Sequence, residues 1–119
     1  IFKTQVFLCK TIRSINGVAL SSRNKLLKKK DLKASGLIAN KLIKLKKSIS
    51  AKKGTTYIDL KISRALIKKT KENLIKKFNI KIEYLECRNL VNLNTDLKNK
   101  PFKLFIAYYF DDIRVIDNF

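Results

Sequence analysis

The stretch Leu104-Phe105-Ile106-Ala107-Tyr108-Tyr109, with Asp111-Asp112 and Ile113-Arg114-Val115-Ile116 after it, decides the fold class of this 119-residue chain. Its first part is almost wholly apolar, and its last part is rich in β-branched residues. The two adjacent aspartates between them are typical of a tight reversal of the chain. The pattern predicts a β-hairpin over the C-terminal residues.

A further strand is predicted upstream of this hairpin. Ile80, Ile82 and Tyr84 alternate with Lys81 and Glu83, and the strand is expected to continue to residue 88. Alternation with a period of two places one set of side chains on a buried face. We therefore expect three strands, paired mainly antiparallel.

Two amphipathic helices are predicted before the strands. In residues 28–50 and 57–78, apolar side chains recur at spacings of three and four, and lysines occupy the remaining positions. Gly54 is expected to end the first helix, and Thr55 or Thr56 to cap the second. The buried stripes are expected to include Leu37 and Leu42 in the first helix, and Ile58, Ile62, Ala65, Leu66, Leu74, Ile75 and Phe78 in the second. Together these elements predict a small two-layer α+β domain, with two helices packed on a three-stranded sheet.

The N-terminal residues 2–13 are rich in aromatic and β-branched side chains and predict another strand. Asn16-Gly17 then predicts a turn, and residues 18–24 a loop before the first helix. The two cysteines, Cys9 and Cys87, lie inside predicted strands and are expected to be small core residues. The chain has no histidine and no cysteine cluster, so no zinc site is expected.

The formal net charge of +19 is compatible with nucleic-acid binding. However, 23 of the 28 basic residues are lysine, and isoleucine and asparagine are also abundant. These three residue types share A/T-rich codons, so a biased genome would give the same composition. Arginine is the usual phosphate and base reader. A stand-alone basic nucleic-acid-binding module remains the alternative hypothesis, while the leading hypothesis includes no specific nucleic acid.

No apolar run approaches the length of a membrane span, and the N-terminus lacks the pattern of a signal peptide. We therefore expect a cytoplasmic protein that does not bind membranes. The chain does not begin with methionine, which suggests that it is a piece of a longer protein.

Ser21, Ser22 and Arg23 form the one segment whose residue types suit chemistry better than packing. A guanidinium, two hydroxyls and the start of a helix together favour phosphate. The same three residues also fit a solvated turn followed by a helix cap, and local physics alone does not separate these interpretations.

Three segments, in order, resemble the pantothenate synthetase (pantoate–β-alanine ligase) family. Residues 11–13 and 16–24, TIR and NGVALSSRN, are similar to the family's T-V-R and D-G-L-A-M-S-S-R-N. Residues 82–86, IEYLE, resemble V-D-Y-V-E, and residues 114–118, RVIDN, resemble R-L-I-D-N. The matches span nearly the whole chain.

The resemblance implies a C-terminal part only. Residues 1–17 would be the final strand and linker of a missing Rossmann-like domain, and residues 18–119 a lid domain with the S-S-R-N phosphate loop. The family joins pantoate to β-alanine through a pantoyl adenylate, and converts ATP to AMP and pyrophosphate. This part alone is expected to be inactive, and a structural domain that has lost its catalytic partner stays possible. Full-length enzymes are expected to form homodimers through the N-terminal domain.

The resemblance also implies roles for individual residues. Ser21, Ser22 and Arg23 would contact the triphosphate, with Arg23 as the catalytic residue that neutralises charge as pyrophosphate departs. Leu20 would contribute backbone contacts to the ATP site, and Ile12 would lie on its adenine side. Mg²⁺ would be held mainly through the phosphates, without protein ligands, and this part would bind no cofactor tightly. Two further residues, Asn24 and Arg13, are expected to brace the loop and to support the structure, respectively.

Overall fold

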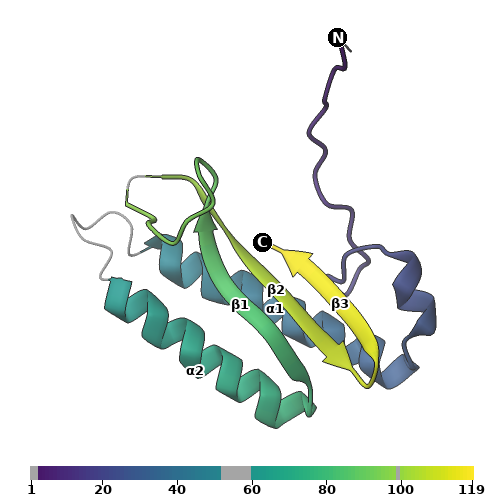
Figure 1. Ribbon diagram of the computed structural model, residues 1–119. Coiled ribbons are helices and arrows are strands. Elements are labelled where there is room, and N and C mark those ends of the chain that lie inside the picture. The colour runs from purple at the N-terminus through teal and green to yellow at the C-terminus, as the bar shows by residue number, and fades with distance from the viewer. Residues whose placement is uncertain (1–2, 52–59, 99) are drawn as a thin grey trace.

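The computed structural model describes residues 3–51, 60–98 and 100–119, except for the side chains of residues 60 and 61. Along the chain lie the 3-10 helix η1 (Ser22–Leu26), helices α1 (Lys29–Ala51) and α2 (Leu60–Phe78), and strands β1 (Lys81–Asn89), β2 (Phe102–Phe110) and β3 (Ile113–Asn118). The strands form an antiparallel sheet in the order β1-β2-β3. Both helices cover the same face of this sheet (Figure 1). The predicted two-layer α+β architecture is confirmed.

The core lies between β2 and the two helices. Leu104 and Ile106 of β2 are fully buried, as are Leu42 and Ile49 of α1 and Leu74 of α2. Alternate residues of β2 point to one face of the sheet, and Ile82, Leu85 and Cys87 of β1 join them in the core. Helix α1 packs on the central strand β2, and α2 packs on β1 and on α1.

The turn between β2 and β3 is confirmed at the predicted aspartates. Asp111 has a positive φ of 49°, a conformation that aspartate tolerates better than most residues. Its carboxylate also accepts a hydrogen bond of 3.1 Å from Lys28 Nζ. This exposed contact links the turn to the segment between η1 and α1.

The predicted alternation of β1 is wrong at one position. The pairing with β2 shifts between Ile82 and Tyr84, so a β-bulge interrupts the period of two. As a result, Leu85 is buried on the core face, 6% exposed, and Tyr84 is only partly buried. The bulge adds one residue, which moves the later side chains to the other face.

The predicted buried stripes of the helices are too wide. Ile62 and Ile75 of α2 are 44% and 40% exposed, Ala65 is also exposed, and Leu37 of α1 is 47% exposed. A helix in a two-layer domain has a sheet on one side only, so it buries a narrow face. The expectations for Gly54, Thr55, Thr56, Tyr57 and Ile58 lie outside the described residues. Neither α1 nor α2 has the length and apolar character of a membrane-spanning helix.

The strand predicted over residues 2–13 is not formed. Residue 2 lies outside the described part, and residues 3–12 have no regular secondary structure and are exposed, Cys9 among them. A strand needs a neighbour for its backbone hydrogen bonds. Among the described residues, pairing of this segment is limited to its end, where Arg13 forms an isolated bridge to Ala19 and the Ile12 carbonyl accepts from Leu20 N–H. Cys87 is buried as predicted, and burial raises the pKa of its thiol to about 11.

Replacing Leu42 by alanine should lower the free energy of unfolding by about 2–5 kcal/mol, because the change removes a fully buried side chain and leaves a cavity. Leu37→Ala, the same change on an exposed face of α1, is the matched control and should have little effect. Urea denaturation followed by circular dichroism measures both. Equal losses of stability would show that the core is not where the structure places it.

Candidate functional site

A tight turn precedes the serine–arginine segment. Ser14 N–H donates to the Val18 carbonyl at 2.8 Å, and Leu20 N–H donates to the Ile12 carbonyl at 2.9 Å. Gly17 has a φ of +91°, which strongly favours glycine at that position. The turn predicted from Asn16-Gly17 is thus confirmed, and it places the following residues against the N-terminal half of α1.

Gly36 of α1 lets this turn approach the helix closely. A Cβ atom at Gly36 would lie 2.9 Å from the Asn16 carbonyl oxygen, which is closer than real Cβ contacts allow. The glycine therefore has a packing role that outweighs its low helix propensity. It sets the distance between the turn and α1.

The serine–arginine segment forms the start of η1. Ser21 caps this short helix, because its Oγ accepts a hydrogen bond from Arg23 N at 3.2 Å. Asn24 donates from its side-chain amide to the Ala19 carbonyl at 3.0 Å. The predicted bracing role of Asn24 is confirmed.

Arg13 joins this region to the C-terminal strand. Its Nη1 and Nη2 atoms donate to the two carboxylate oxygens of Asp117 at 2.8 and 3.0 Å. Further hydrogen bonds reach the carbonyls of Gly17 and Asn118, at 3.0 and 2.9 Å. The guanidinium also lies 4.5 Å from the centre of the Phe119 ring. The pair is largely buried, and the predicted structural role of Arg13 is confirmed.

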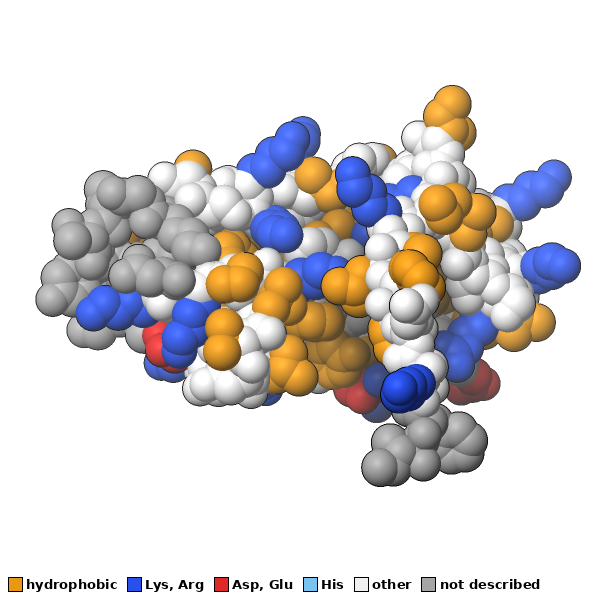
Figure 2. Space-filling view, turned by 90° about the horizontal axis from the view of Figure 1, so that it is seen from above, with side chains coloured by type: hydrophobic (Ala, Val, Ile, Leu, Met, Phe, Trp, Pro, Cys, Tyr) orange, Lys and Arg blue, Asp and Glu red, His pale blue; other side chains and the backbone are white. Residues whose placement is uncertain are grey.

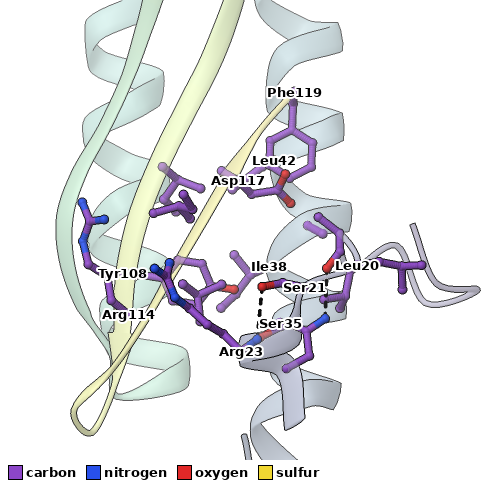
Figure 3. A pocket seen from close by; sticks show the side chains of 17 residues that line it. Leu20, Ser21, Arg23, Ser35, Ile38, Leu42, Tyr108, Arg114, Asp117 and Phe119 are labelled. Atoms are coloured by element: carbon purple, nitrogen blue, oxygen red, sulfur yellow. Dashed lines mark hydrogen bonds between the residues drawn. The ribbon is translucent and has the colours of Figure 1, made fainter. Parts of the chain in front are cut away.

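A cavity of about 250 Å³ lies between the serine–arginine segment, α1 and the sheet. Arg23 and Ser21 lie at its mouth, Ser35 and Ile38 come from α1, and Tyr108 comes from β2. In Figure 3 the side chain of Arg23 extends from η1 toward β3 and Tyr108. The cavity thus has a cationic mouth and a mainly apolar interior.

The charged side chains around this cavity differ in whether they already have an ion-pair partner. Arg114 lines the cavity but turns to β1, where it forms hydrogen bonds of 2.8 and 3.0 Å with the Glu83 carboxylate. The hydrogen bond from Arg114 holds the pKa of Glu83 below its usual value. Asp117 is engaged by Arg13. Arg23 is exposed, and its guanidinium forms no hydrogen bond or ion pair within the described part of the chain. It is therefore available to an incoming anion.

On the face shown in Figure 2, the basic side chains do not form a single stripe. Figure 2 shows lysine and arginine side chains spread over the face in view, with apolar side chains between them. Exposed apolar residues include Val6, Phe7, Leu8 and Leu20. On this face, the net charge of +19 does not mark one binding surface.

The structure brings together three of the five predicted ATP-site residues. Leu20, Ser21 and Arg23 line the cavity. Ser22 is exposed beside them but is not part of the lining, and Ile12 is 68% exposed on the arm that precedes the turn. Ile12 is tied to the site only through its backbone bond with Leu20.

Ser35 and Tyr108 line the same cavity and were missed from the sequence. Ser35 is a polar residue on the apolar stripe of a helix, which was the one available signal. Tyr108 lies within an apolar strand, where a core tyrosine gives no signal.

Among the described residues, no group of three or more His, Cys, Asp or Glu side chains could hold a metal ion.

The comparisons of this sequence with known proteins all point to one family. A model of the family described as Pantoate-beta-alanine ligase matches residues 1–119. The chain is similar to the pantothenate synthetase of Clostridium botulinum, with 33% identity over 120 residues that cover 99% of this chain and 40% of the relative. It is 30% identical to that of Flavobacterium psychrophilum over 118 residues, 97% of this chain and 39% of the relative. The chain thus spans about two fifths of the length of these relatives.

The fold has a counterpart among solved structures. The crystal structure of pantothenate synthetase from Thermus thermophilus superposes with a TM-score of 0.68 at 21% identity. The match covers 92% of this chain and 37% of that one. At this identity the likeness concerns the fold.

Gly36→Ala should lower the free energy of unfolding by about 1–2 kcal/mol, although alanine is the better helix former. The added methyl group would collide with the Asn16 carbonyl and displace the turn. Lys44→Ala, at an exposed position of α1, should be close to neutral. Thermal unfolding measures both variants, and a stabilised Gly36→Ala protein would contradict the close approach.

Asp117→Asn should destabilise the chain by about 2 kcal/mol, because an amide cannot accept both guanidinium hydrogen bonds and leaves Arg13 without its counter-charge. The control is Asp111→Asn, which removes an exposed carboxylate that pairs with Lys28 and should change stability little. Chemical denaturation compares the two. A loss no greater than that of the control would contradict the role given to the Arg13–Asp117 pair.

Proposed function

Because the chain belongs to the pantoate–beta-alanine ligase family, we propose that it acts as the ATP-facing lid of an enzyme that joins pantoate to β-alanine. The substrates of the whole enzyme would be ATP, pantoate and β-alanine. In the first step a pantoate carboxylate oxygen attacks the α-phosphorus of ATP, and the bond to the bridging oxygen breaks to release pyrophosphate. In the second step the amine of β-alanine attacks the acyl carbon, and AMP leaves.

The observation that carries this proposal is the position of Arg23. Arg23 and Ser21 line the same cavity, and the Arg23 side chain extends from η1 toward β3. A free guanidinium and a hydroxyl donor suit the terminal phosphates of a nucleotide. Charge builds up on pyrophosphate as it departs, and a positioned cation stabilises that charge. In this proposal Arg23 is the catalytic residue, and Ser21 and Ser22 bind the triphosphate.

The supporting residues keep this segment in place. Asn24 fixes η1 to Ala19, and the turn before it rests against Gly36. Arg13 binds the same turn through the Gly17 carbonyl. Catalysis by electrostatic stabilisation requires donors that are already positioned. These contacts give the serine–arginine segment a firm base, while the Arg23 side chain itself remains free.

The rest of the nucleotide site would come from outside the segment. In this proposal residues 1–17 connect residues 18–119, the lid domain, to a nucleotide-binding domain, which holds adenine and pantoate. Leu20 and Ile12, both largely exposed, would then face that domain. Mg²⁺ would be held through the phosphates. Exposed apolar side chains beside a phosphate site fit contact with such a domain.

Arg23→Ala in the full-length enzyme should lower the rate of pantoyl adenylate formation by on the order of 10²-fold or more. The attack of β-alanine on preformed adenylate should change less, because pyrophosphate has already left. Rapid-quench measurement of pantoyl adenylate separates the two steps.

Lys25→Ala is the matched control, since it removes a positive charge from the same short helix without touching the cavity lining. It should adenylate pantoate at nearly the normal rate. An Arg23→Ala enzyme with an unchanged adenylation rate would refute the assignment of Arg23.

A further inference from the structure

A second cavity, of about 290 Å³, lies between α2, β1 and the loop that follows β1. We call it the α2–β1 cavity. Figure 1 shows α2 running alongside β1, with this loop at the end of the strand. Among the described residues, the two cavities have no lining residue in common. The proposed function gives the α2–β1 cavity no role.

The interior of the α2–β1 cavity is apolar. Ile67 of α2, Leu85 and Cys87 of β1 and Leu97 of the loop line it. Leu85, Cys87 and Leu97 are 6%, 5% and 2% exposed. Burial raises the pKa of the Cys87 thiol to about 11, so the thiol adds no charge to this wall at neutral pH. The interior therefore favours an apolar group.

A buried asparagine holds the loop side of this cavity in place. Asn89, at the end of β1, is 0% exposed, and its side-chain amide donates to the carbonyl oxygens of Asn94 and Asp96 at 3.3 and 2.7 Å. Two backbone N–H groups of the loop donate to its side-chain oxygen, both at 3.0 Å. Thr95 and Leu97, which line the cavity, lie next to these anchored residues. The loop is thus fixed before a ligand arrives, which lowers the cost of binding.

Three cations of α2 also line the cavity, namely Arg64, Lys68 and Lys71. Their spacing of four and three residues places them on one side of the helix. Within the described part of the chain, none of them forms an ion pair. Glu86 is a lining residue too, but Arg88 Nη2 donates to its carboxylate at 2.8 Å. The charge offered to a ligand is therefore that of the three cations.

The apolar interior distinguishes these three cations from the many other lysines of the surface. A lysine in open solvent attracts anions weakly, because water and salt screen its charge. Beside an apolar wall the same charge acts more strongly, because the local dielectric constant is lower. A ligand whose apolar part fills the cavity would bring its anionic group to the cations. The combination therefore selects a molecule that has both parts.

The size of the cavity limits the apolar part of the ligand. A volume of about 290 Å³ equals that of about ten water molecules, at roughly 30 Å³ each in the liquid. It lies at the lower end of the range for ligand pockets. A short aliphatic chain or a single ring fits this volume, whereas a large polycyclic molecule does not.

We propose that the α2–β1 cavity binds a small amphipathic anion. Its apolar chain or ring lies against Leu85, Cys87 and Leu97, and its anionic group lies beside Lys68 and Lys71. This site is independent of the proposed function, which places ATP at the serine–arginine segment. An occupant would contact α2, β1 and the loop together, and would stabilise the folded domain by binding to it.

Isothermal titration calorimetry of the full-length enzyme with sodium octanoate tests this proposal. Two comparison ligands each keep one part of octanoate: 1-octanol has the chain without the charge, and sodium acetate has the carboxylate without the chain. Octanoate should bind about tenfold more tightly than either, and its binding should weaken as the salt concentration rises. Equal binding of octanoate and 1-octanol, or no binding of octanoate, would overturn the proposal.

A double variant, Lys68→Ala with Lys71→Ala, tests the cations. It should bind octanoate about tenfold more weakly and 1-octanol as the unmodified enzyme does. The matched control is Lys69→Ala with Lys76→Ala, which removes two charges from the same helix outside the cavity lining. The control should bind octanoate normally. If both double variants lose the same affinity, only the net charge matters and the proposed site is wrong.

Thr95→Trp tests the location of the apolar part. Thr95 is an exposed loop residue that lines the cavity, so an indole side chain at this position should fill the space and abolish binding of both octanoate and 1-octanol. Val91→Trp is the control, because Val91 is 68% exposed on the same loop and is not a lining residue. A Thr95→Trp enzyme that binds octanoate normally would contradict this location.

Thermal unfolding separates lost binding from lost folding. Without ligand, the variants should melt close to the unmodified enzyme, because none of them changes a fully buried side chain. Octanoate should raise the melting temperature of the unmodified enzyme and leave that of Thr95→Trp unchanged. If Thr95→Trp does not fold, the variant of Lys68 and Lys71 decides, and normal octanoate binding by that variant would overturn the proposal.

Discussion

The bidentate pair between Arg13 and Asp117 is the contact on which the arrangement of the site depends. It joins residues 104 positions apart in the chain, and it binds the turn at Gly17 and the backbone at Asn118 with the same guanidinium. The segment before η1 is also held by the buried Val18 side chain and by the close approach at Gly36. A planar fork with five donors is suited to tie several acceptors at once. The pair therefore fixes the position of the turn that precedes Val18, Ala19 and Leu20, which line the cavity.

The cavity combines two kinds of environment. Its interior is built from core residues of α1 and β2, such as Ile38 and Ile106, and its mouth from an exposed arginine. A low-dielectric wall strengthens the attraction between that arginine and an anion.

Much of the fold was predictable because its signals are local. The apolar run of β2, the aspartate turn and the helical periodicity of α1 each act within a few residues. The predictions failed where a neighbour decides the outcome. Residues 3–12 carry strand-forming side chains, but among the described residues only the Ile12 carbonyl has a backbone partner outside the segment, Leu20 N–H. Leu85, and not Tyr84, lies on the core face of the sheet because a bulge shifts the register of β1. The sequence pattern of one strand does not reveal a bulge.

By itself, the sequence determined the α+β class, the order of the elements, the turn at Asn16-Gly17 and the family to which the S-S-R-N segment points. These features depend on propensity, on periodicity and on residue types in a short window. Only the tertiary structure decided that Ser35 and Tyr108 share a cavity with Arg23, that Ser22 is not part of its lining, and that Asp117 is neutralised by Arg13. The physical reason is that these relations depend on distances between elements, which packing sets and no local pattern contains.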